Sequence, residues 1–170
     1  RWMNDGAFDG GQLSDAEQDL RDFYVRLLNL SATEAAFGGE YGEIHSHNRE
    51  QTAEYDERLF SFVRWQGDDR VIVATNFDAD AAYDLRLLVP KSVISAWRLD
   101  DGRYTLHELL DGGRGNLIVD DGAGWLNVEL APLGSAVLKV GDANIERLSN
   151  VESDFVTARH IDVWLPDGYH

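Results

Sequence analysis

Two histidines with one residue between them, His45 and His47, are the first candidates for chemistry in this sequence. On an extended segment, side chains two residues apart point to the same side, so the two imidazoles would form one edge of a metal site. The surrounding polar stretch offers no further ligands at a suitable spacing, and loop histidines that face solvent are the alternative. We expect no metal ion and no other cofactor.

A second group of oxygen ligands lies near the N-terminus, where Asn4, Asp5 and Asp9 precede Gly10 and Gly11. Carboxylate and amide oxygens suit calcium, but this spacing does not match an EF-hand loop. Short Asx side chains beside glycines are typical of turns. We expect these residues to form a turn rather than a cation site.

Aromatic rings form the third group, and five of them are tryptophans. β-Sandwich modules that bind sugars present exposed, coplanar rings that stack on pyranose faces. The candidates for such a carbohydrate-binding surface are Trp65, Trp97, Tyr104 and Trp125. The alternative is that these rings pack in the core or at a domain interface.

No catalytic residue can be assigned from the sequence. It contains no cysteine, so it has neither a disulfide framework nor a thiolate metal site. It also lacks the Gly-x-Ser-x-Gly turn that exposes the nucleophilic serine of many hydrolases.

The charge of the chain excludes two classes of partner. Acidic residues outnumber basic ones by 31 to 15, which gives a net charge of −16. Nucleic acids and anionic membranes both attract basic surfaces, so we expect neither as a partner. No apolar run is long enough to span a membrane and no signal peptide is evident. The acidic composition favours a periplasmic or secreted location in a bacterium.

The elements that must position these residues are mainly strands. Eight short runs show strand-like alternation or β-branched composition, at 59–65, 70–77, 83–89, 93–100, 103–110, 115–120, 124–130 and 134–140. Asp101-Gly102 is a hairpin signal between two of them, and residues 40–57 read as a long surface loop. The spacing predicts a mainly β fold with an antiparallel Greek-key β-sandwich over 38–141; a closed barrel is the alternative.

One amphipathic helix precedes these strands. Ser14 and Glu17 have the spacing of a capping box, and the helix is expected to end between residues 30 and 34. Its broad apolar face consists of Leu20, Phe23, Tyr24, Leu27 and Leu28. Because full burial of each large side chain is worth roughly 2 kcal/mol, this face must pack against a partner.

Three segments of this region carry a resemblance to a known family: NDGAFDGG at 4–11, LRDFY at 20–24 and LLNL at 27–30. They resemble the end of the catalytic barrel in the α-amylase superfamily, most of all bacterial amylase and cyclomaltodextrinase-like members of glycoside hydrolase family thirteen. The resemblance implies that residues 1–37 are a loop and the last barrel helix, and that 38–141 are the noncatalytic C-terminal sandwich. Leu20, Phe23, Tyr24 and Leu27 would then pack against the barrel.

This resemblance also implies where the parent enzyme's chemistry would lie. Such enzymes cleave α-glucans (starch and maltooligosaccharides) with paired carboxylates on upstream barrel strands. The Arg-x-Asp and His-Asp motifs of that site are absent from this chain, so we expect the active site to precede Arg1. Two alternatives stay open: a freestanding carbohydrate-binding module, and a structural domain that dimerises through the helix face.

The last segment, 142–170, reads as a linker followed by the opening strand of another module. Residues 159–169 weakly resemble the first strand of α/β-hydrolase-type esterases. The alternating stretch 160–165 would otherwise add a ninth strand to the sandwich.

Overall fold

The computed structural model describes residues 6–7 and 11–143, together with the backbone of 155–157. The chain divides into two compact units, Arg1–Glu34 and Ala35–His170. Among the described residues, no helix is both long and apolar enough to cross a membrane.

The first unit contains the expected helix, α1 (Asp15–Thr33). Its capping box is confirmed, because the Glu17 amide donates to Ser14 Oγ and the Ser14 amide donates to the Glu17 carboxylate. These two bonds satisfy backbone donors that a helix N-terminus otherwise leaves free. The helix ends within the predicted interval.

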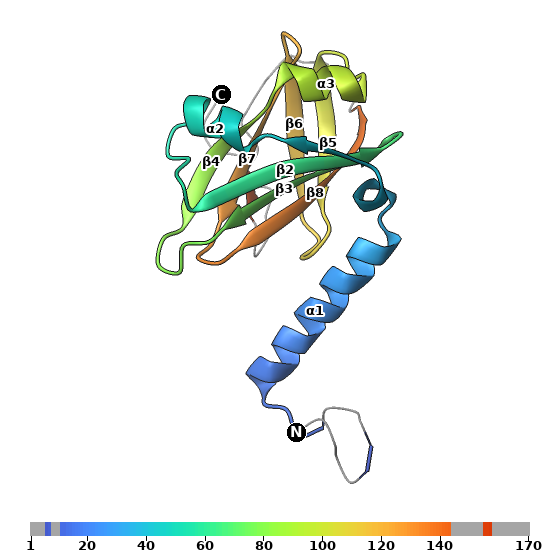
Figure 1. Ribbon diagram of the computed structural model, residues 1–170, viewed down its shortest axis with the longest axis vertical. Coiled ribbons are helices and arrows are strands. Elements are labelled where there is room, and N and C mark those ends of the chain that lie inside the picture. The colour runs from blue at the N-terminus through green and yellow to red at the C-terminus, as the bar shows by residue number, and fades with distance from the viewer. Residues whose placement is uncertain (1–5, 8–10, 144–154, 158–170) are drawn as a thin grey trace, which may run out of the picture. The chain divides into compact units, whose positions relative to one another are not determined.

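The second unit is mainly β, as predicted (Figure 1). Its strands are β1 (Glu40–Glu43), β2 (Leu59–Gln66), β3 (Asp69–Asn76), β4 (Tyr83–Val89), β5 (Gly102–Glu108), β6 (Arg114–Asp120), β7 (Ala123–Leu130), β8 (Ser135–Ala143) and β9 (Phe155–Thr157). Three short helical segments accompany them: η1 (Ala35–Gly38), α2 (His45–Gln51) and α3 (Lys91–Trp97).

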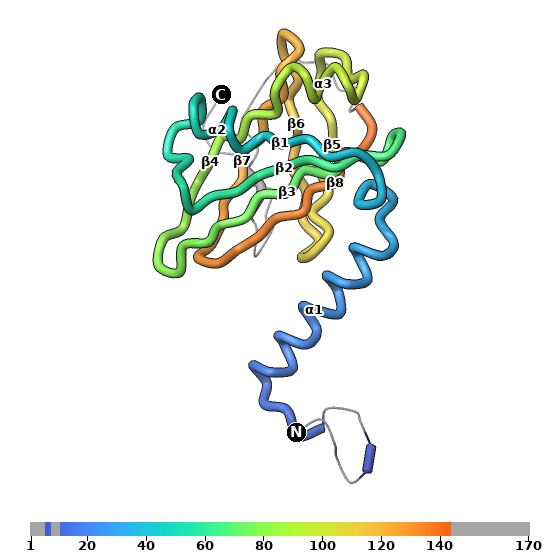
Figure 2. Tube along the Cα trace, viewed as in Figure 1, coloured from blue at the N-terminus to red at the C-terminus, as the bar shows by residue number. Residues whose placement is uncertain are grey.

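Eight strands form one curled antiparallel sheet in the order β1-β2-β3-β8-β5-β6-β7-β4. The tube view shows β1, β2, β3 and β8 as one layer, with β5, β6, β7 and β4 as the other (Figure 2). β8 pairs with β3 on one side and with β5 on the other, with a bulge between Tyr104 and Leu106. Because β8 returns to lie beside β5 of the β5-β6-β7 meander, the order 8-5-6-7 is a Greek key.

The core lies between these two layers. On β5 and β7 every second residue is buried, and the buried sets include Tyr104 and Leu106, and Leu126 and Val128. The first layer contributes Leu59 and Val63 of β2, Ile72 of β3 and Leu138 of β8. This two-residue period is the reason that the sequence pattern located strands such as β2 and β7, whereas β3, with four consecutive buried residues, was located by its β-branched composition.

The strand predicted at 93–100 is wrong, because α3 occupies 91–97. Pro90 precedes the helix and its carbonyl accepts from the Val93 and Ile94 amides, while Arg98 ends the helix in the left-handed conformation with φ of 55°. Val93, Ile94 and Trp97 fall on one helical face and are all buried. The β-branched Val93 and Ile94 suggested a strand, but the spacing of the three buried residues suits a helix. Asp101-Gly102 therefore joins α3 to β5 and is not a hairpin.

The predicted loop at 40–57 is also partly wrong, since it contains β1 and α2. Tyr41 pairs with Arg64 of β2, so β1 extends the first layer by one strand. α2 has no apolar stripe, and its one buried residue is Asn48. Periodicity therefore gave no signal for this helix.

β9 pairs in parallel with residues 127–129 of β7. The stretch 160–165, which suggested a ninth strand, and the esterase-like residues 159–169 lie outside the described residues. The same is true of the candidate turn residues Asn4, Asp5 and Asp9.

Candidate interdomain surface and sugar-binding residues

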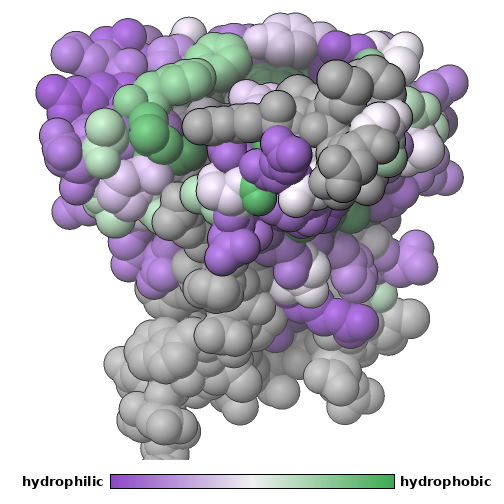
Figure 3. All heavy atoms as spheres, turned by 90° about the horizontal axis from the view of Figure 1, so that it is seen from below, coloured by the Kyte–Doolittle hydropathy of each residue, from purple (hydrophilic) through white to green (hydrophobic). Residues whose placement is uncertain are grey.

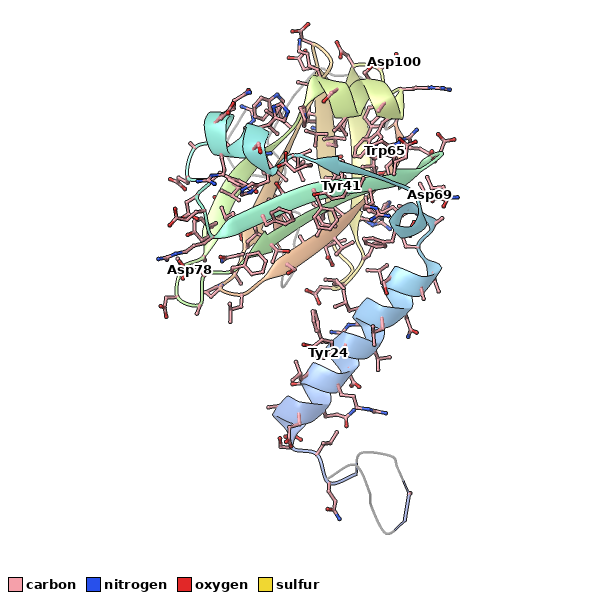
Figure 4. The ribbon with its side chains drawn as sticks, viewed as in Figure 1. Tyr24, Tyr41, Trp65, Asp69, Asp78 and Asp100 are labelled. Carbon is pink, nitrogen blue, oxygen red and sulfur yellow. The ribbon has the colours of Figure 1, made fainter. Side chains whose placement is uncertain are left out.

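The apolar face of α1 is open to solvent over much of its length. Leu20, Tyr24 and Leu28 are 56%, 53% and 65% exposed, and Val25 is 47% exposed. Leu13 and these four side chains line a shallow cavity of about 440 Å³, with Glu17 and Arg21 also at its wall. Figure 4 shows Tyr24 on this helix. An exposed stripe of this size on a capped helix is typical of a surface that packs against another protein part.

Of the four residues predicted to contact a barrel, Leu20 and Tyr24 belong to this exposed face. Phe23 and Leu27 are half-buried. The rings of Phe23 and Tyr24 meet edge to face with their centroids 5.8 Å apart. Val25, and Leu13 before the N-cap, also line this face and were not predicted.

A second apolar surface lies on the outer side of the first layer. Leu59, Ser61 and Val63 of β2 are buried, so the half-buried Phe60 and Phe62 face the opposite way. Phe62 stands opposite Val73 of β3, which in turn stands opposite Val137 of β8. These three side chains make an apolar cross-strand row.

Four rings continue this surface, and we call Tyr41, Phe62, Phe60 and His45 the aromatic row. Successive centroids are 5.7, 5.9 and 5.3 Å apart. Tyr41 is 52% exposed and is labelled on β1 in Figure 4. Of these rings only His45 was a candidate from the sequence, although the alternation of β2 placed Phe60 and Phe62 on one side.

The His45 ring is hydrogen-bonded to a neighbouring tyrosine. Its Nδ1 lies 3.1 Å from the Tyr55 hydroxyl, which lies 2.9 Å from Ser61 Oγ. Burial raises the pKa of Tyr55 to about 12. His45 and His47 lie in α2, so the extended geometry assumed for a metal pair does not occur. Among the described residues, no three His, Cys, Asp or Glu side chains gather in a metal-binding group.

Two of the four predicted sugar-binding rings are core residues. Trp97 is 1% exposed and Tyr104 is 8% exposed, with the Tyr104 hydroxyl donating to the Asp100 carbonyl at 2.9 Å. Trp65 is half-buried and meets Trp97 edge-on at 6.3 Å between centroids. Neither Trp97 nor Tyr104 has a ring face open to a sugar in this fold.

Trp125 has a different environment. It lies on the outer side of β7, because its neighbours Gly124 and Leu126 point into the core. The Arg86 guanidinium lies 4.8 Å from the centre of its ring. Trp125 also lines an open cavity of about 670 Å³, whose polar lining includes His47, Gln51, Lys91, Ser92, Asp120 and Asp121.

A network of charged and polar groups fixes the loop between β3 and β4, at the end where Figure 4 labels Asp78. The Asp78 carboxylate accepts from the amides of Asp80 and Ala81 at 2.8 and 3.1 Å and pairs with Arg58. The Asp80 amide bond, followed by the Arg58 pair, lowers the pKa of Asp78 to about 2. These partners occupy the Asp78 carboxylate and tie the loop to Arg58 before β2, so we assign this network to structure.

The remaining surface is strongly polar. On the face shown in Figure 3, the described residues are mostly hydrophilic and apolar side chains appear in small groups. This distribution agrees with the net charge of −16.

Known proteins resemble this chain in sequence and in fold. A search of curated proteins gives no match. AmyP in complex with maltose has a TM-score of 0.54 at 21% identity, covering 80% of this chain and 23% of AmyP. An AmyP variant in complex with maltotriose has a TM-score of 0.52 at 21% identity, covering 78% and 23%. An α-amylase from Anoxybacillus has a TM-score of 0.51 at 14% identity, covering 82% and 25%.

These structural similarities establish the fold alone, and the chain spans about a quarter of the length of the proteins that it resembles. The family comparison goes further. Residues 50–141, more than half of the chain, match the family described as the C-terminal all-beta domain of α-amylase. The chain therefore belongs to the family of α-amylase C-terminal all-beta domains.

Proposed function

We propose that this chain is the noncatalytic C-terminal region of an α-amylase-like glycoside hydrolase that acts on α-glucans, and that it packs against and stabilises the catalytic barrel. The exposed apolar face of α1 is the observation that carries this proposal. Leu20, Tyr24 and Leu28 are each more than half exposed on a well-capped helix. Family membership supplies the context of an α-amylase-like enzyme.

The energetic argument concerns area removed from water. Complete burial of a Leu or aromatic side chain stabilises a protein by roughly 1.5–3 kcal/mol. Burying the α1 face against a barrel would therefore couple the stability of the barrel to that of this region. The aromatic row offers a second contact surface, since Tyr41 is about half exposed and adjoins Phe62.

The test uses the complete translation product of the gene, assayed for starch hydrolysis and thermal unfolding. Tyr24→Asp places a charge within the apolar face and is expected to lower the melting temperature by several degrees, because a charge buried without a partner is costly. Arg26→Asp introduces the same residue at an exposed position two residues along α1 and is the matched control. We expect its melting temperature to stay within about one degree of the wild type.

Two results would contradict the proposal. One is a complete product without a glycoside hydrolase barrel. The other is a Tyr24→Asp variant that unfolds at the same temperature as the Arg26→Asp control.

A further inference from the structure

The cavity at Trp125 is built from three parts of the chain that are distant in sequence. α2 provides His47 and Gln51, the start of α3 provides Lys91, and the β6-β7 hairpin provides Asp120 and Asp121. Its volume of about 670 Å³ falls in the range of small-molecule sites and exceeds what one sugar ring needs.

Trp125 supplies the aromatic surface of this cavity, beside the apolar Leu88, Pro90 and Ala123. The Arg86 guanidinium covers one face of the indole at 4.8 Å from its centre. A cation over the ring holds the indole in place, so a ligand would find it preorganised. The face that remains for a ligand is the one turned away from Arg86.

The polar lining suits hydroxyl groups. His47 and Gln51 are four residues apart on α2, so both lie on the same side of the helix. The Asp121 carboxylate pairs with Lys91 Nζ at 2.7 Å, and this pair lowers the pKa of Asp121. Amide, imidazole and carboxylate groups together can both donate to and accept from a sugar hydroxyl.

Other classes of ligand fit less well. Two carboxylates in the wall and a net charge of −16 disfavour an anion. A wholly apolar ligand would remove Lys91, Asp120 and Asp121 from water without replacing their hydrogen bonds. Within the described residues, no group of three or more potential ligands gathers for a metal cation. A neutral polyhydroxylated molecule satisfies both the ring and the polar wall.

We propose that this cavity binds a glucose unit of an α-glucan, with the free face of Trp125 stacked on the pyranose ring and Gln51 and Asp120 bonded to its hydroxyls. The choice of an α-glucan rests on the proposed function, whereas the choice of a neutral sugar rests on the cavity itself. Such a site would hold substrate on the noncatalytic region.

The test titrates the 170-residue chain with maltotriose and follows the indole N–H signals of its five tryptophans by NMR. We expect the Trp125 signal to shift saturably at millimolar sugar, while the buried Trp97 signal stays in place. Glycerol at equal concentration should give no saturable shift. A response that glycerol reproduces, or one in which Trp125 does not move, would overturn the proposal.

The affinity of variants for maltotriose tests which residues of the cavity bind the sugar. Trp125→Ala should weaken maltotriose affinity by about tenfold or more, as truncation of a central aromatic residue does in other interfaces. Phe77→Ala is the control, because it removes an exposed aromatic ring outside the cavity. Gln51→Ala, at an exposed helix position, should weaken binding roughly threefold without affecting folding.

Unchanged affinity in both Trp125→Ala and Gln51→Ala would overturn the proposal even if the chain binds maltotriose elsewhere. The Tyr24→Asp test of barrel packing does not involve this cavity. The two proposals therefore fail separately.

Discussion

The side-chain amide of Asn48 makes two hydrogen bonds to the backbone of Leu88, in the way that a neighbouring strand would. The Asn48 amide Nδ2 donates to the Leu88 carbonyl at 2.9 Å, and the Leu88 amide donates to Asn48 Oδ1 at 2.8 Å. β4 is the last strand of the curled sheet, so these are backbone groups that a free edge would leave without a strand partner. α2 thus protects the edge of β4 with a single fully buried side chain.

Asn48→Ala should destabilise the sandwich by roughly 2–4 kcal/mol, because it removes the partners of both the amide and the carbonyl of Leu88. Urea unfolding measures the loss, and hydrogen exchange at the Leu88 amide locates it. Ser46→Ala, at an exposed position of the same helix, is the control and should change stability by less than about 0.5 kcal/mol. Equal stabilities of the two variants would show that the edge of β4 needs no such partner.

Gly39→Ala should separate β1 from β2. A Cβ at this position would lie 2.0 Å from the Trp65 carbonyl oxygen, a distance at which the backbone must move. We expect a loss of more than about 2 kcal/mol, typical of strain in packed regions. At the adjacent Gly38 the nearest atom is 3.7 Å away at the end of the Gln66 side chain, so Gly38→Ala should be nearly neutral. A neutral Gly39→Ala would contradict the pairing of these strands.

Glu108 fixes the turn between β5 and β6, and its removal should be costly. One carboxylate oxygen accepts from the amides of Leu110 and Asp111, and the other accepts from the Val137 amide at 3.0 Å. Glu108→Gln turns an NH₂ group toward amide donors, and we expect a destabilisation of roughly 1–3 kcal/mol. The exposed Glu57→Gln is the control. Chemical denaturation of both variants provides the measurement, and a loss no larger than that of the control would refute the role of Glu108.

Asp78 should make the stability of the sandwich sensitive to acid. The Asp80 amide, Arg58 and the Ala81 amide lower its pKa from 3.8 to about 2, so the ionised form favours the folded state. This contribution is complete above about pH 4 and is lost as the pH falls toward 2. The difference in unfolding free energy between wild type and Asp78→Asn should therefore shrink over that interval. A difference that stays constant from pH 7 to pH 2 would contradict the assignment.

The strands of the sandwich could be predicted because their side chains alternate. In β2, Leu59, Ser61 and Val63 face the core while Phe60 and Phe62 face outward. α1 could be predicted because Ser14 and Glu17 form a capping box at its N-terminus and its apolar residues recur at helical spacing. Both signals are local, so one sequence suffices to detect them.

The helices α2 and α3 were missed for two different reasons. α2 is held by the hydrogen bonds of Asn48, which leave no apolar pattern. In α3 the spacing of Val93, Ile94 and Trp97 was helical, but β-branched residues before an Asp-Gly pair favoured a strand.

The cavity at Trp125 could be predicted only in part. The ring itself was a candidate, because sandwich modules that bind sugars present aromatic rings to pyranose faces. Its polar neighbours His47, Lys91 and Asp120 come from separate elements, which the pairing of β4 with β7 and the attachment of α2 to β4 bring together. The spacing of residues within one segment does not show which distant segments lie side by side in the fold.

The double pairing of β8 has a mechanical consequence. In a sandwich of two independent sheets, the sheets can separate by losing only the side-chain contacts between them. Here β8 pairs with β3 on one side and with β5 on the other, so separating the two layers also requires breaking backbone hydrogen bonds along β8. We therefore expect the two layers to unfold together under mechanical force, in one step rather than one after the other.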